Sequence, residues 1–170
     1  MSSSSLDQRR NFLKFALGGA SLLALSQARV ARAATAGVTV SKVSRSNAEW
    51  KKLLTPDQYY ILREEGTERP YTSELLKEKR NGTFACVACD LPLFASNTKF
   101  ESGTGWPSFF QAIEGHVESK TDYKIIVPRT EYHCARCGGH HGHVFEDGPK
   151  PTGLRYCNNG VALKFIPATA

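Results

Sequence analysis

The sequence lacks an apolar run long enough to cross a bilayer. Its most apolar stretch, residues 15–25, has about 11 residues, whereas a membrane-spanning helix needs about 20. We therefore expect no transmembrane helix in this stretch.

A strong charge of either sign is also missing from most of the chain. The formal net charge of +6 arises mainly at the N-terminus, because residues 1–33 hold five of the 22 Lys and Arg residues but one of the 16 acidic residues. Residues 34–170 therefore carry only +2. This near-neutral remainder argues against nucleic acid as a partner.

The first 33 residues have the organisation of an export signal. The pair Arg9 and Arg10 precedes the apolar stretch, and Ala33 follows small residues of the kind that a signal peptidase reads. This pattern predicts a twin-arginine signal peptide over residues 1–33, periplasmic or other exported localisation, and no stable membrane anchor after cleavage. The alternative, a basic amphipathic surface helix, would need a polar face that residues 15–25 lack.

The remaining chain has room for one domain, since it contains no repeat and no second change of composition. We predict a linker over residues 34–45 and a domain over residues 46–167. Capping patterns that begin at Ser46 and Thr55 predict two short helices, to about residues 54 and 65. Their expected apolar faces consist of Trp50, Leu53, Leu54, Tyr59 and Leu62.

From residue 82 onward, short β-prone runs alternate with turn residues, and a further helical turn or two is expected just before them, within residues 73–79. The fold class is therefore mainly β, an antiparallel structure with short N-terminal helices. The predicted strands are residues 83–86, 117–120, 123–127, 131–134, 143–145, 154–157 and 161–165.

Cysteine is scarce, and four of the five cysteines form two Cys-x-x-Cys pairs, Cys86/Cys89 and Cys134/Cys137. Two such pairs resemble zinc knuckles, which together supply the four thiolates of a tetrahedral structural Zn²⁺ site. A complete thiolate set leaves no open position for water, which argues against hydrolytic zinc. Two disulfides or one redox-active pair are the alternatives, but twin-arginine export of a folded, metal-loaded protein favours one structural Zn²⁺.

The fifth cysteine, Cys157, is then free to react. In an extended segment Arg155 and Asn159 project on the same face as Cys157, and the arginine is expected to lower the thiol pKa. His143 and Phe145 likewise share one face of a predicted strand. A thiolate, an imidazole and amide donors together suit covalent catalysis by cysteine.

Each of these residues also has an ordinary structural interpretation. A lone cysteine is often a small core residue, and Asn159 with Gly160 could form a hairpin turn. Arg155 could simply pair with a carboxylate. The histidines of the 140–143 segment could be exposed or bind further metal.

Three sequence blocks, residues 102–109, 140–149 and 153–159, together with the cysteine pairs, resemble the methionine-R-sulfoxide reductase B family over about residues 47–166. The resemblance implies two antiparallel β-sheets (a β-tent) with zinc at one end. It also implies reduction of the R epimer of methionine sulfoxide, in oxidised proteins and peptides or as the free amino acid.

The resemblance assigns roles position by position. Cys157 matches the catalytic cysteine, Trp106 matches the ring that accepts the substrate methyl group, and His140 and His143 match the polar pair near the sulfoxide oxygen. The residues that orient the reacting groups and shape the pocket match Arg155, Asn159 and Phe145.

Two departures from the family pattern stand out. Thr104 occupies a position where many members carry a resolving cysteine, so we expect an external, thioredoxin-like thiol reductant to regenerate Cys157. His141 and Gly160 replace the more usual Leu and Ser. The rival functions are an exported zinc-ribbon binding module without catalysis and a cysteine hydrolase that needs no reductant.

Overall fold

The computed structural model describes residues 39–169. The predicted signal peptide and the first part of the predicted linker lie outside these residues. Within the described chain, no helix is both long and apolar enough to cross a membrane.

Two short helices begin the described domain, α1 (Asn47–Leu53) and α2 (Pro56–Glu64). Both predicted capping boxes are present, because the Ser46 and Thr55 side chains accept hydrogen bonds from the third helical N–H. Four of the five predicted apolar side chains are buried. The exception is Leu53, whose side chain is 58% exposed at the end of α1.

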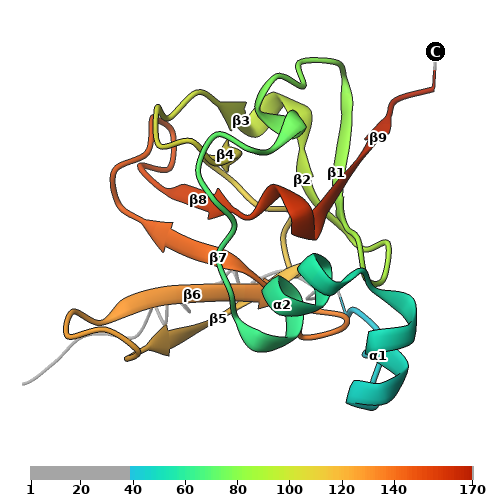
Figure 1. The fold of residues 1–170 in the computed structure, drawn as a ribbon. Coiled ribbons are helices and arrows are strands. Elements are labelled where there is room, and N and C mark those ends of the chain that lie inside the picture. The colour runs from blue at the N-terminus through green and yellow to red at the C-terminus, as the bar shows by residue number, and fades with distance from the viewer. Residues whose placement is uncertain (1–38, 170) are drawn as a thin grey trace, which may run out of the picture. The chain divides into compact units, whose positions relative to one another are not determined.

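The rest of the domain consists of two antiparallel sheets (Figure 1), which confirms the predicted fold class. The smaller sheet has the order β2-β1-β9 and the larger one β3-β4-β8-β7-β6-β5. The small-sheet strands are β1 (Gly82–Cys86), β2 (Pro92–Ala95) and β9 (Leu163–Pro167). The large-sheet strands are β3 (Lys99–Phe100), β4 (Ser108–Phe109), β5 (Val117–Asp122), β6 (Arg129–Cys134), β7 (His140–Phe145) and β8 (Arg155–Asn158). Three single-turn 3₁₀ helices complete the described structure: η1 (Glu74–Leu76), η2 (Ser96–Thr98) and η3 (Gly160–Ala162).

The prediction of a strand over residues 123–127 is wrong. These residues form the loop of the β5–β6 hairpin, and their apolar, β-prone character is outweighed by the pairing register, in which Asp122 faces Arg129. The Asp122 carboxylate accepts the Lys124 N–H at 2.8 Å, which turns the chain away from the strand direction. Asn159 likewise forms no hairpin turn but immediately precedes η3.

An aromatic core joins the two sheets. Phe94 of β2 stacks on Phe109 of β4 with the ring centroids 4.4 Å apart, and Phe84 of β1 meets Phe109 edge-on at 4.9 Å. Tyr132 of β6 contacts Phe94 from the large sheet. All four side chains have no exposed surface, so this cluster fixes how the sheets pack.

Candidate functional site

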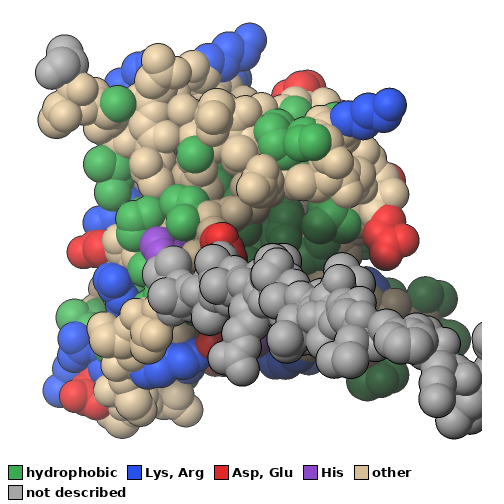
Figure 2. All heavy atoms as spheres, turned by 180° about the vertical axis from the view of Figure 1, so that it is seen from behind, with side chains coloured by type: hydrophobic (Ala, Val, Ile, Leu, Met, Phe, Trp, Pro, Cys, Tyr) green, Lys and Arg blue, Asp and Glu red, His purple; other side chains and the backbone are tan. Residues whose placement is uncertain are grey.

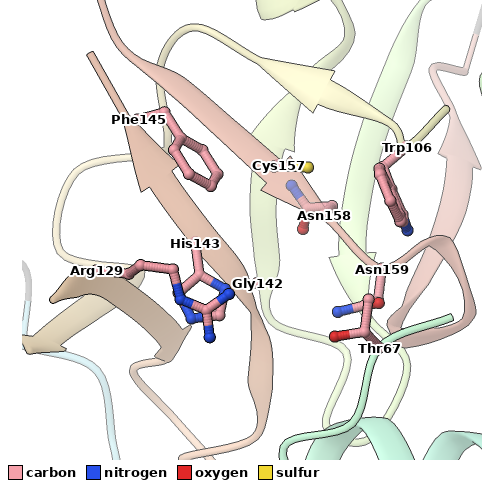
Figure 3. Close-up of a pocket in the computed structure, with 9 residues that line it drawn as sticks. All are labelled: Thr67, Trp106, Arg129, Gly142, His143, Phe145, Cys157, Asn158 and Asn159. Atoms are coloured by element: carbon pink, nitrogen blue, oxygen red, sulfur yellow. The ribbon is translucent and has the colours of Figure 1, made fainter. Parts of the chain in front are cut away.

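A pocket of about 140 Å³ opens where β7 and β8 lie beside the loop before β4 (Figure 3). In this view the Cys157 sulfur lies between the Phe145 and Trp106 rings, with His143 below them. The remaining lining residues are Thr67, Arg129, Gly142, Asn158 and Asn159. Five of the seven residues predicted for catalysis or substrate binding thus line one pocket.

The register of β7 and β8 places the Cys157 thiol beside the His143 imidazole. His143 is the direct partner of Cys157 across these antiparallel strands, so both side chains point to the same face. Gly142 makes the close approach possible. A Cβ atom there would lie 1.9 Å from the Cys157 carbonyl oxygen, so any side chain would push β7 away from β8.

The loop after α2 holds Trp106 and Asn159 through a single residue, Glu68. Its carbonyl accepts the Trp106 indole N–H at 3.2 Å, and its N–H donates to Asn159 Oδ1 at 2.9 Å. The half-buried Glu68 carboxylate accepts the N–H groups of Gly160 and Val161, while burial raises the pKa of this carboxyl group. The aromatic wall of the pocket is therefore fixed by the segment that follows the helices.

His143 is held from behind by a buried carboxylate. Its Nε2 lies 2.8 Å from Asp122 Oδ2, which also accepts a hydrogen bond from Arg129 at 2.6 Å. The hydrogen bond from Lys124 N–H, followed by those from His143 and Arg129, holds the pKa of Asp122 well below its usual range. The Asp122 carboxylate thus occupies Nε2 and orients the imidazole ring beside Cys157.

His140 lies next to the pocket but does not line it. Its ring meets the His143 ring edge-on at 5.5 Å between centroids, and its Nδ1 lies 2.9 Å from the buried Glu131 carboxylate. Burial lowers the pKa of His140, and Glu131 opposes this effect. Glu131 is itself paired with Lys120 at 2.9 Å, so His140 belongs to a charged network behind His143.

The expected lowering of the Cys157 pKa by Arg155 is not what the structure gives. Burial raises the pKa of the Cys157 thiol above its ordinary value, and the charge of Arg155 together with a Thr104 hydrogen bond only partly offsets this. The effect of Arg155 on the thiol is reduced by Asp147, whose carboxylate accepts two hydrogen bonds of 2.7 and 2.8 Å from the guanidinium. The guanidinium also covers the Phe145 ring at 4.4 Å.

Asn159 is largely occupied by structural hydrogen bonds. Its Nδ2 donates to the His141 carbonyl at 3.0 Å and its Oδ1 accepts from Glu68, so the amide is fixed at the pocket edge. His141 is fully buried, and burial lowers its pKa to about 3. His141 is therefore neutral. The alternative that this histidine is exposed at the surface is wrong.

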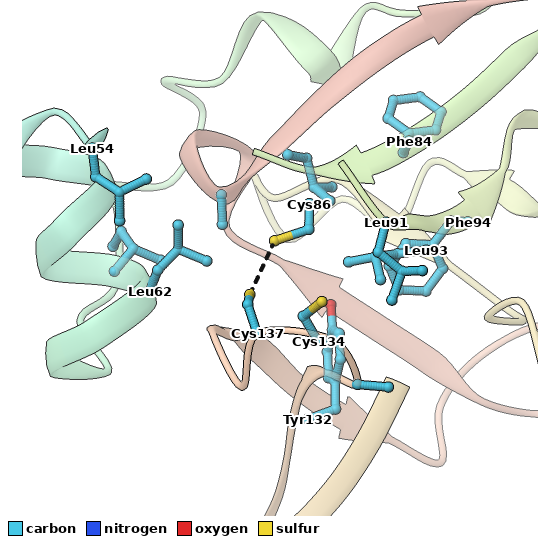
Figure 4. Close-up of a cluster of buried hydrophobic side chains, with 14 of the residues drawn as sticks. Leu54, Leu62, Phe84, Cys86, Leu91, Leu93, Phe94, Tyr132, Cys134 and Cys137 are labelled. Atoms are coloured by element: carbon cyan, nitrogen blue, oxygen red, sulfur yellow. Dashed lines mark hydrogen bonds between the residues drawn. The ribbon is translucent and has the colours of Figure 1, made fainter. Parts of the chain in front are cut away.

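The four paired cysteines meet at a second site, where the β1–β2 hairpin of the small sheet faces the β6–β7 hairpin of the large sheet. Figure 4 shows three of them, Cys86, Cys134 and Cys137. The four sulfurs all lie within 4.8 Å of one another. Cys86 Sγ is 3.7 Å from Cys137 Sγ, and Cys89 Sγ is 3.4 Å from Cys134 Sγ.

These distances fit a tetrahedral metal site. Four sulfurs at about 2.3 Å from a Zn²⁺ ion are separated from one another by about 3.8 Å, whereas a disulfide bond is about 2.05 Å long. All five cysteines of the described chain are free thiols, and Cys157 is not part of the cluster. The cluster is thus a possible metal site that would clamp the two sheets together.

Several pocket residues were not predicted from the sequence. Thr67, Arg129 and Asn158 line the pocket, and Asp122 holds His143 from outside it. Asp122 and Arg129 flank a hairpin loop as an acid–base pair, which is the one local signal that could have identified them.

The fold and the site together define a class of protein: a small two-sheet protein with one thiol in an aromatic, histidine-containing pocket and a separate four-cysteine cluster. Comparison with known proteins then identifies the family. The model of the SelR domain matches residues 54–167. The chain belongs to this family, the MsrB (SelR) family.

Individual relatives are similar over the same region. The chain is 53% identical over 131 residues to peptide methionine sulfoxide reductase MsrB of Agrobacterium fabrum, which covers 76% of this chain and 97% of the relative. It is 55% identical over 124 residues to peptide methionine sulfoxide reductase MsrB of Methanosarcina barkeri, and this match covers 72% of this chain and 87% of the relative. The chloroplastic peptide methionine sulfoxide reductase B1 of Arabidopsis thaliana is 58% identical over 122 residues, covering 71% of this chain and 60% of the relative.

Proposed function

We propose that this protein is a peptide-methionine (R)-S-oxide reductase, which returns oxidised methionine residues of proteins to methionine. The observation that carries the proposal is the pocket itself, where Cys157, His143 and the Trp106 ring converge in a chain of the MsrB family. A zinc-ribbon binding module would have no use for a free thiol in such a pocket.

The residues divide the reaction between them. A sulfoxide sulfur is a weak electrophile until its oxygen is protonated, and the Nδ1 of protonated His143 supplies this proton while Asp122 holds Nε2. The Cys157 thiolate forms a bond to the sulfoxide sulfur. The oxygen then passes to Cys157 as a sulfenic acid, and the reduced thioether, methionine, leaves.

The pocket walls select the epimer. Trp106 and Phe145 offer an apolar surface for the methyl group, while His143 provides a polar site for oxygen. Because sulfur in a sulfoxide is tetrahedral, one apolar and one polar subsite around Cys157 accept one configuration and disfavour its mirror image.

An external thiol completes the cycle. One thiol attacks the sulfenic acid, forms a mixed disulfide and releases water, and a second thiol frees Cys157 as a disulfide of the reductant leaves. The support for this route is that Thr104 faces Cys157 and that the other four cysteines form their own cluster. A thioredoxin-like dithiol is the suitable donor.

We also propose that Cys86, Cys89, Cys134 and Cys137 hold one structural Zn²⁺. A tetrathiolate site is coordinatively closed, so the ion would supply cross-linking of the two sheets and no catalysis. Export through the twin-arginine route is a further part of the proposal, supported by Arg9, Arg10 and the apolar stretch that follows.

Turnover on separated epimers tests the function. With dithiothreitol as reductant, a peptide carrying methionine R-sulfoxide should be reduced, whereas the S epimer should react at least about 100-fold more slowly, a difference of about 3 kcal/mol. Chiral chromatography of the products measures both rates. Equal rates for the two epimers, or turnover without a reductant, would contradict the proposal.

The raised pKa of Cys157 predicts how fast this thiol is alkylated at each pH. The reactive thiolate becomes more abundant as pH rises toward the thiol pKa, so the rate at which iodoacetamide alkylates Cys157 should increase about tenfold per pH unit below that pKa. Thr104→Val removes a hydrogen bond that favours the thiolate, so its rising limb should shift to higher pH, while Thr104→Ser keeps the hydroxyl and the wild-type profile. A Thr104→Val profile unshifted, or shifted to lower pH, would show that this hydroxyl does not stabilise the thiolate.

A further inference from the structure

The loop of the β5–β6 hairpin, residues 123–127, exposes an unusual concentration of apolar side chains. Tyr123 is 75% exposed, Ile125 49%, Ile126 102% and Val127 66%. These four account for half of the large exposed hydrophobic side chains in the described chain. In Figure 2, hydrophobic side chains lie at the lower right, at the end of the molecule where Figure 1 places the tip of this hairpin.

Both ends of the loop are part of the active site. Asp122, which precedes the loop, binds His143, and Arg129, which follows it, lines the pocket. The two ends also bind each other through the 2.6 Å ion pair between their side chains. The loop that carries the apolar tip is therefore joined at both ends to residues at the pocket.

The pocket is too small for more than one side chain. A volume of about 140 Å³ accommodates the side chain of methionine sulfoxide but not its neighbours in a polypeptide. The residues on either side of the substrate residue must then lie outside, across the rim. Methionine is among the residues most often buried, so an unfolded stretch that exposes its sulfoxide also exposes other apolar core residues.

We propose that the 123–127 loop binds apolar residues that flank methionine sulfoxide in a flexible stretch of an oxidised polypeptide. The inference rests on the proposed function and adds a substrate preference to it. Apolar flanks would cover Ile126 and Val127 and remove from water surface that the free protein leaves exposed.

A lipid surface is the other apolar partner that such a loop could meet, and the charges near it disfavour this. Surface segments that bind anionic membranes gain affinity from basic groups that are free to contact the headgroups. Here the neighbouring cations are paired: Lys120 with Glu65 and Glu131, Lys124 with Glu65, and Arg129 with Asp122.

Two peptides of equal length test the proposal, each with one methionine R-sulfoxide, flanked by leucine and valine in the first and by serine and glycine in the second. With dithiothreitol, the wild-type kcat/KM should be about tenfold higher for the apolar peptide, mostly through a lower KM. The double variant Ile126→Ser/Val127→Ser should lose this preference and keep the wild-type rate on the polar peptide and on N-acetylmethionine R-sulfoxide. Leu53→Ser removes a 58% exposed apolar side chain from α1, outside the loop, and should behave as wild type.

Two results would overturn the inference while leaving the proposed function intact. In the first, the wild type reduces both peptides equally, or the double variant retains the preference for the apolar one. In the second, the double variant loses sedimentation with vesicles of phosphatidylcholine and phosphatidylglycerol but treats both peptides as the wild type does. Absence of activity on all three sulfoxides would instead overturn the proposed function.

Discussion

Replacing Cys157 by serine should lower kcat/KM for an R-sulfoxide peptide by at least about a thousandfold, since the variant loses the only nucleophile that the proposed mechanism uses. A serine hydroxyl in the same half-buried position is not ionised near neutral pH and forms no sulfenic acid. Steady-state rates with dithiothreitol measure the loss.

Mass spectrometry of the wild type after one turnover without reductant is the companion measurement. We expect one added oxygen on Cys157, or a mixed disulfide when a small thiol is present. The Cys157→Ser protein should show neither product while it keeps its metal content and its thermal unfolding midpoint. Full activity of the variant, or an internal disulfide from Cys157 in active wild-type enzyme, would contradict the mechanism.

Loss of the metal should unfold the domain. Structural zinc sites contribute about 10–16 kcal/mol of apparent binding free energy, and a domain of this size is typically stable by only about 5–15 kcal/mol. The two quantities are comparable, and the Cys86–Cys137 and Cys89–Cys134 contacts join the two sheets directly. We therefore expect Cys137→Ser, or prolonged chelation, to abolish the cooperative thermal transition.

Metal analysis and circular dichroism check this expectation. The wild type should contain one zinc per chain, and Cys137→Ser should contain little or none. Cys157→Ser serves as the matched control, because it removes a thiol outside the cluster and should leave both metal content and unfolding unchanged. A metal-free wild type with the same unfolding midpoint would disprove the clamp.

Local signals in the sequence were sufficient for much of the fold. The capping boxes at Ser46 and Thr55 are satisfied by residues three positions away, so the helices could be predicted within one residue of their ends. The strands β3 and β4 could not be predicted. They have only two residues each and form through pairing with distant partners rather than through their own propensity. Residues 123–127 were mistaken for a strand because β-propensity describes a residue type and not its place in a hairpin.

The chemistry of the site was likewise only partly visible. Cys157 and His143 were singled out by the chemistry of thiol and imidazole groups, whereas Trp106 came only from the resemblance to the family, and all three line the pocket. The direction of the shift in the Cys157 pKa could not be predicted from the sequence. It depends on how far the effect of burial outweighs the charge of Arg155, and burial follows from tertiary packing. The role of Glu68 in positioning the pocket residues could not be predicted from its residue type. It depends on the N–H, the carbonyl and the carboxylate of Glu68, which bind three different residues.

Glu68 connects the helical segment at the start of the described domain to the pocket. It lies four residues beyond α2, yet its backbone holds the Trp106 indole and the Asn159 amide, and its carboxylate holds the turn after β8. A change in how α2 packs would consequently reach the Trp106 indole through the Glu68 backbone. We therefore expect substitutions in α2 to alter substrate affinity more than the rate of the chemical step.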